Sequence, residues 1–376
     1  MAIISFKCPN CDGELIFDPS TQKYKCEYCY SLFSQEELEA MRPAQSSERV
    51  EADPLENGSP TEKFGKDYDR AEALGSDPVN NGAGETARAV IYTCPSCGAQ
   101  IVTDETTAAT FCYYCHNPVV LTGRLEGEYL PDKIIPFEID RRAAEKSFLE
   151  HVGKKRFIPK AFFGKKQIES MTGVYFPYWL YDVDLEGNLQ GEARNIRVWR
   201  RGDDEYTETT IFDIRREGSI SLSNLPGNAL KKANVKLAEN VLPYNVDKLK
   251  EFHTGYLSGF MAERRDIEQA EVQGGMQATM RDSAEKLLRE TVSGYNSVSV
   301  RSSNFVPREE KWQYVLFPVW TITYKGRNGK IYYYSMNGQT GKVCGELPVD
   351  YGKLSLASGI LAVTVLILAL IGGFFL

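Results

Sequence analysis

Eight of the nine cysteines occur in four Cys-x-x-Cys pairs, arranged as two sets with 14 residues between the pairs of each set. Two such pairs about 15 residues apart are typical of a tetrahedral four-cysteine zinc site, in which tight turns point thiolates at one ion. A closed shell of this kind leaves no position for a catalytic water. The sequence therefore predicts two structural Zn²⁺ ions. Their ligands would be Cys8, Cys11, Cys26 and Cys29 in one site, and Cys94, Cys97, Cys112 and Cys115 in the other.

The second set ends in CYYCH (residues 112–116), which read alone is the attachment signature of a c-type haem. The duplication argues against haem, because the first set has Tyr30 where the second has His116. The start of the chain, MAIISFKCPNCDGEL, also lacks the features of an export signal. A redox dithiol, and His116 as an alternative ligand, stay open beside structural zinc. Cys344, the ninth cysteine, is expected to be a buried structural thiol.

The charge balance limits the classes of partner. The formal net charge is −7, and each four-thiolate site holding Zn²⁺ adds a further −2, so two loaded sites bring the total to −11. Nucleic-acid binding relies on basic surface, so this balance opposes it in general while leaving room for a local basic patch. Reduced thiolate sites indicate a reducing compartment.

Residues 354–376, LSLASGILAVTVLILALIGGFFL, carry no charge. As a helix they would span about 35 Å, enough for the hydrocarbon core of a bilayer. With no export signal ahead of it, this segment predicts a single-pass tail anchor in the cell membrane, with the N-terminal bulk cytoplasmic. Only Lys353 abuts the helix, so this orientation rests on the missing signal more than on flanking charge.

These elements predict an α+β multidomain protein. Residues 1–34 form a first zinc ribbon, 35–89 a disordered acidic linker, 90–122 a second zinc ribbon, 130–349 an antiparallel β-rich α+β domain, and 354–376 the transmembrane anchor. The linker has too few large apolar residues to offset its ordering entropy. The first ribbon is therefore expected on a flexible tether.

The β-rich domain contains a short internal repeat. YFPYW at 175–179 recurs in outline as LFPVW at 316–320, and each is followed by an alternating stretch and a Gly turn, which predicts antiparallel hairpins and a half-domain repeat. The aromatics are expected in the core. Helices are predicted from Asp140 through Glu150, over 246–265, and over 267–292.

No catalytic constellation is found in the sequence. There is no phosphate-binding loop and no G-x-S-x-G elbow, and the three histidines have no metal-binding or catalytic spacing to one another. The sequence therefore predicts a protein that is not an enzyme.

A basic segment at 154–166 interleaves cations with three Phe residues. Such a pattern binds anionic lipid headgroups or single-stranded nucleic acid, or else forms a solvated loop with its apolar residues tucked inward. The membrane anchor on the same chain favours lipid over nucleic acid. The candidate contact residues are Lys154, Lys155, Arg156, Lys160, Lys165 and Lys166.

The order of motifs resembles a group of bacterial membrane-anchored double zinc-ribbon proteins, found mainly in Firmicutes. The likeness rests on CPNC-x14-CEYC, CPSC-x14-CYYC after a linker, LFPVW, NGQTGKVCGELP and the terminal apolar helix. Members often carry labels such as transcription factor IIB-type zinc ribbon or primosomal helicase-like protein. The resemblance implies an envelope-stress module with SPFH-domain or phage-shock-protein-A-like partners.

Three functions are therefore open. The first is a non-enzymatic, membrane-anchored adaptor that holds protein partners at the cytoplasmic face. The alternative is a nucleic-acid-binding, replication-associated zinc-ribbon protein, which would show salt-sensitive binding through the basic segment. The third, an enzyme such as a helicase, lacks a nucleotide site in this sequence.

Overall fold

A computed structural model describes residues 6–41, 90–98, 100–112, 115–231, 240–326 and 329–374. Most of the predicted linker, 42–89, lies outside these residues, as do Phe375 and Leu376 at the end of the predicted anchor. The start of the predicted linker is helical, since α1 (Gln35–Ala40) begins directly after the first ribbon. Ser34 caps α1 by accepting a hydrogen bond from the Glu37 amide, which explains why the helix starts there.

The two ribbons are built from short strands. The first contains β1 (Leu15–Asp18), β2 (Lys23–Cys26) and β3 (Leu32–Phe33) in one antiparallel sheet. The second contains β4 (Val90–Thr93) paired with β5 (Gln100–Thr103), and β6 (Thr107–Phe111) paired with β7 (Pro118–Val120). Strands β6 and β7 belong to the large sheet of the next domain, so the second ribbon is continuous with that domain.

The large sheet has ten strands. Its main path runs β11-β8-β13-β9-β12-β6-β7, with β10 beside β9 and with β14 and β15 beyond β13. Most pairs are antiparallel, as predicted, but β12 runs parallel to β9 and β13 runs parallel to β8. The bounds are β8 (Lys133–Ile134), β9 (Thr172–Arg201), β10 (Asp204–Asn228), β11 (Lys250–Glu251), β12 (Met261–Glu263), β13 (Ser297–Lys325), β14 (Ile331–Asn337) and β15 (Val343–Gly345).

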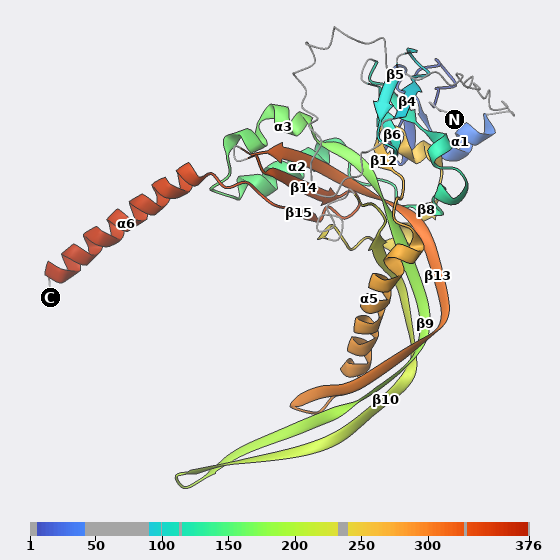
Figure 1. The fold of residues 1–376 in the computed structure, drawn as a ribbon. Coiled ribbons are helices and arrows are strands. Elements are labelled where there is room, and N and C mark those ends of the chain that lie inside the picture. Colours follow the sequence, from blue (N-terminus) through green and yellow to red (C-terminus); the bar gives the residue numbers. More distant parts are fainter. Residues whose placement is uncertain are drawn as a thin grey trace, which may run out of the picture.

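Three very long strands form a curved arm that leaves the body of the domain (Figure 1). In this arm β9 lies between β10 and β13, and register shifts at Leu222/Leu225, Val300/Ser302 and Pro307/Glu309 interrupt the ladders. Such bulges bend a strand and increase its twist, which accounts for the curvature. The two Phe-Pro-x-Trp stretches face each other here, because Phe176 pairs with Phe317. The predicted repeat is therefore a pair of adjacent strands.

Helix α5 (Gln269–Glu290) packs on the concave side of the arm (Figure 1). It matches the helix predicted over 267–292, and its buried residues recur every four positions at Met276, Met280, Ala284 and Leu288. This stripe packs against Leu185, Leu189 and other apolar residues of the arm. Helix α5 thus covers the apolar face of the three-stranded arm and completes a hydrophobic core there.

Two further helices, α2 (Arg141–Gly153) and α3 (Lys165–Glu169), lie at one end of the domain (Figure 1). Helix α2 begins where predicted, because the Asp140 side chain accepts a hydrogen bond from the Ala143 amide at 2.7 Å. Helix α3 is short. The helix predicted over 246–265 is wrong. That segment holds β11, β12 and two short 3₁₀ turns, Val246–Lys248 and Thr254–Leu257.

The final helix, α6 (Tyr351–Phe374), contacts the domain at its first turn and then extends away from the body (Figure 1). Residues Tyr351–Leu370 have a mean hydropathy of 2.2 and none of this stretch is buried. Among the described residues it is the one helix long and apolar enough to cross a membrane. Exposure of so much apolar surface is unfavourable in water, which makes this helix a candidate membrane anchor.

Candidate metal centres

Each Cys-x-x-Cys pair forms a tight turn, here called a knuckle. The residue after the second cysteine has a left-handed backbone in all four knuckles, with φ between 60° and 73°. Its amide donates a hydrogen bond of 2.9–3.0 Å to the carbonyl oxygen of the first cysteine. This conformation turns the chain sharply enough to bring both sulfurs to one side. The residues concerned are Asp12, Tyr30, Gly98 and His116.

The knuckle geometry settles the place of His116. It closes the last knuckle as Tyr30 closes the second, and it lies outside the four-residue metal group of its ribbon. The role of His116 is therefore to adopt the left-handed backbone conformation, which Asn, Asp, His and Gly adopt more readily than other residues. Cys344 is also outside both groups. It lies in β15, half-buried, and burial raises the pKa of its thiol.

The structure brings all eight predicted ligands together in two groups of four sulfurs. Within each group the sulfurs lie within 4.8 Å of one another. The closest pairs are Cys8–Cys29 at 3.6 Å and Cys11–Cys26 at 3.5 Å in the first ribbon, and 3.7 Å for both pairs in the second. Four sulfurs at about 2.3 Å from Zn²⁺ in a tetrahedron lie about 3.8 Å apart. The two groups therefore fit a Zn²⁺ ion each.

The thiols within each group differ in their electrostatic surroundings. Burial raises the pKa of Cys115 to about 12, and the nearby thiols of Cys97 and Cys112 add to this effect. At Cys29 the Ser31 hydroxyl, 3.2 Å from the sulfur, lowers the pKa to about 6 together with the Ser31 backbone. A Zn²⁺ ion bound to such a group would favour the thiolate form of all four ligands.

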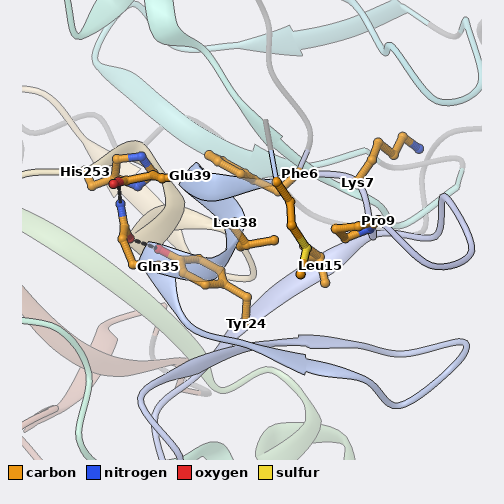
Figure 2. Close-up of a pocket in the computed structure, with 10 residues that line it drawn as sticks. Phe6, Lys7, Pro9, Leu15, Tyr24, Gln35, Leu38, Glu39 and His253 are labelled. Atoms are coloured by element: carbon orange, nitrogen blue, oxygen red, sulfur yellow. Dashed lines mark hydrogen bonds between the residues drawn. The ribbon is translucent and has the colours of Figure 1, made fainter. Parts of the chain in front are cut away.

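The first ribbon is docked on the domain by direct contacts, whereas the tether predicted at 42–89 lies outside the described residues. The Phe17 amide donates to the Ser258 carbonyl at 3.1 Å, and the Ser258 hydroxyl donates to the Leu15 carbonyl at 2.6 Å. The Phe17 and Tyr256 rings meet edge to face at 5.1 Å. Helix α1 is held to the ribbon beside this contact (Figure 2), because the Tyr24 hydroxyl donates to Gln35 at 2.6 Å.

A small cavity of about 60 Å³ remains inside this contact (Figure 2). Phe6, Leu15, Tyr24 and Leu38 of the N-terminal part line it, and His253 closes it from the domain. It has room for only a few water molecules. We therefore interpret the cavity as part of the docking contact and not as a ligand site.

Glu14 joins the two ribbons. Its side chain, 7% exposed, pairs with Lys7 at 2.6 Å and accepts hydrogen bonds from Ser96 at 2.9 Å and Asn117 at 3.4 Å. Ser96 lies inside the first knuckle of the second ribbon, and Asn117 follows its last knuckle. Nothing in the local sequence pattern distinguishes this carboxylate from a solvated acid, so its role could not be found from the sequence.

The basic segment lies between α2 and α3. Lys154, Lys155, Arg156 and Lys160 are exposed, whereas Ile158 and Phe162 are buried. The side chains of Lys165 and Lys166 lie outside the described part of the structure. The apolar residues thus fix the segment to the domain, and the described cations face outward.

One comparison with known proteins shows a full-length relative. The chain is 31% identical over 378 residues to a protein of Bacillus subtilis (strain 168) described as "Uncharacterized protein YdjG", covering 99% of this chain and 100% of the relative. The chain therefore belongs to the YdjG family. No family model and no solved structure matches it.

Proposed function

We propose that this member of the YdjG family is a non-enzymatic adaptor. Helix α6 anchors it in the cell membrane, the bulk of the chain lies on the cytoplasmic side, and the ribbons hold a protein partner there. Two Zn²⁺ ions are structural in this proposal, since each four-sulfur group can fill a tetrahedral shell with protein ligands alone. The exposed apolar surface of α6 supports the anchor.

The observation that carries the proposal is the exposure of large apolar side chains beside the first metal group. Tyr28 and Tyr30 are 73% and 72% exposed and flank the ligand Cys29. Leu32 extends the same surface. Aromatic residues that remain in water on a rigid, metal-held turn are suited to a protein interface, where Tyr is enriched.

The second ribbon offers a related surface. Ile91 and Val102 pair across β4 and β5 and are 61% and 52% exposed. Glu14 links this ribbon to the first one, so the two surfaces lie on ribbons in contact with each other. The resemblance to membrane-anchored double zinc-ribbon proteins makes SPFH-domain and phage-shock-protein-A-like proteins the first partners to test in an envelope-stress module.

In-cell crosslinking followed by membrane isolation and mass spectrometry tests the proposal. The wild-type protein should capture a defined protein partner, and Tyr28→Ala with Tyr30→Ala should lose it while keeping two zinc ions per chain. Tyr206→Ala with Phe212→Ala is the matched control, because it removes two exposed aromatics from the distant arm. Loss of capture in the control alone would contradict a ribbon interface.

The anchor is tested in the same assay. Removing residues 354–376 should release a soluble protein and leave the partner off the membrane. If the partner stays at the membrane without these residues, recruitment does not pass through this chain, and the adaptor proposal fails.

A further inference from the structure

The basic segment lies directly against the start of the apolar helix. The Asp350 amide, one residue before α6, donates to the Phe157 carbonyl at 2.7 Å. The Lys353 ammonium, in the first turn of α6, donates to the Ile158 carbonyl at 2.6 Å. Two hydrogen bonds therefore tie residues 157–158 to the point where the chain would enter a membrane.

The cations of this segment face solvent. Lys154, Lys155 and Arg156 are exposed, and in the described part of the chain none of them forms an ion pair. Their field acts on the neighbouring His151, whose pKa is lowered by burial and then by Lys155 and Lys154. Three adjacent exposed cations contrast with a chain whose formal charge is −7, in which basic side chains such as Arg200, Lys248 and Arg308 are paired with acids.

The segment is also held rigidly. Ile158 is 4% exposed and Phe162 is fully buried, with its ring 5.5 Å from that of Phe148 in α2. Phe157, between the cations and these anchors, is 36% exposed. The arrangement places three positive charges and one aromatic ring outward on a fixed base beside α6. Basic and aromatic residues together suit the headgroup layer of a membrane.

We propose that residues 154–157 form a site for anionic phospholipid headgroups, in which the cations bind phosphate and Phe157 contacts the acyl boundary. This inference rests on α6 spanning the membrane as in the proposed function. Basic residues at the membrane surface attract anionic lipid, and each contributes up to about a fivefold preference. The attraction weakens strongly in concentrated salt, because the Debye length falls to about 3 Å at 1 M.

The test uses the full-length zinc-loaded protein in vesicles of zwitterionic lipid. The vesicles contain equal small fractions of photo-crosslinkable phosphatidylglycerol and phosphatidylcholine, and mass spectrometry measures the ratio of the two adducts. Wild type should favour phosphatidylglycerol at least fivefold, with adducts near residue 157. Lys154→Gln, Lys155→Gln and Arg156→Gln together should bring the ratio close to one. All three side chains are exposed, so the fold should be retained, which the zinc content checks.

The matched control neutralises three exposed cations far from α6, by Arg281→Gln, Lys286→Gln and Lys311→Gln. It makes the same change in net charge and should leave the adduct ratio unchanged. A wild-type ratio of one would overturn the lipid site, as would an equal loss in the control. So would a result in which the Lys154 triple variant loses only binding of a single-stranded oligonucleotide, since that outcome assigns the segment to nucleic acid.

Flotation separates this inference from the proposed function. Protein that floats with purely zwitterionic vesicles but shows no phosphatidylglycerol preference has a valid anchor and no lipid site. Protein that floats only when phosphatidylglycerol is present has the lipid site without a spanning anchor. Protein that floats with neither overturns both.

Discussion

Gly259→Ala should weaken the docking of the first ribbon on the domain while leaving both metal groups intact. Gly259 has φ of +90°, which L side chains rarely adopt, and a Cβ at this position would lie 2.2 Å from Ile16 Cγ2. Ordinary contacts of this kind begin near 3.4 Å. Because Gly259 and Ile16 meet across the docking contact, the overlap can be relieved by moving the ribbon outward.

The size of the effect follows from two separate terms. The left-handed backbone costs an alanine about 1 to 2 kcal/mol. Overpacking against Ile16 adds about 1 to 3 kcal/mol. Only the second term bears on docking. The Phe17 amide, which donates to Ser258 across the contact, should therefore exchange with solvent roughly 5 to 150 times faster.

Hydrogen–deuterium exchange of the Phe17 amide measures this opening directly. Gly294→Ala is the matched control, because Gly294 has φ of +86° but nothing within 4 Å of an added Cβ, so it carries the strain without the overlap. Adding Ile16→Ala to Gly259→Ala removes the clashing Cγ2 and should restore protection. Equal exchange in the two glycine variants, or loss of zinc from Gly259→Ala, would refute the reasoning.

Three further perturbations test other contacts. Cys97→Ser should unfold the second ribbon and lower the zinc content from two ions per chain to one by elemental analysis, because metal binding and folding are linked; two retained ions would contradict this. Glu14→Gln should weaken the joint between the ribbons by about 1 to 3 kcal/mol, with non-additivity toward Ser96→Ala in denaturant titrations as the check. Lys155→Gln should raise the pKa of His151 toward its usual value in an NMR titration. The lowered pKa means that protonation of His151 opposes folding, so the stability lost as pH falls through about 6.5 should shrink in this variant.

The metal centres could be predicted from sequence because their signal is local. The Cys-x-x-Cys spacing determines each knuckle, and repetition of that spacing pairs the knuckles without any long-range information. Helix α5 was predictable for a similar reason, since Met276, Met280 and Ala284 recur at helical spacing. Asp140 likewise indicated the start of α2 through its capping side chain.

The docking contact could not be predicted because it joins residues that are far apart in the sequence. The composition of 246–265 favours a helix, yet Gly255 lies against Tyr24 and Gly259 against Ile16. A Cβ at Gly255 would lie 2.4 Å from the Tyr24 hydroxyl. These glycines leave room for side chains of a ribbon more than 200 residues away in the sequence. Local periodicity in the sequence cannot reveal so distant a contact. The length of β9, β10 and β13 could not be predicted for a related reason, because only their mutual pairing reveals it.

The hydrogen bond between Leu15 and Ser258, which spans 243 residues, has a consequence for synthesis. The first ribbon is made early and can bind its ion as soon as Cys29 has left the ribosome, since its ligands are close in sequence. The segment around Ser258, on which the ribbon docks, is synthesised much later. Contacts between residues so far apart in the sequence form slowly. For that interval Ile16 and Phe17 are exposed on a finished metal module, which makes the newborn chain a substrate for chaperones that cover apolar surface. Zinc availability would then affect folding of the first ribbon early in synthesis, and chaperone availability would affect its docking later.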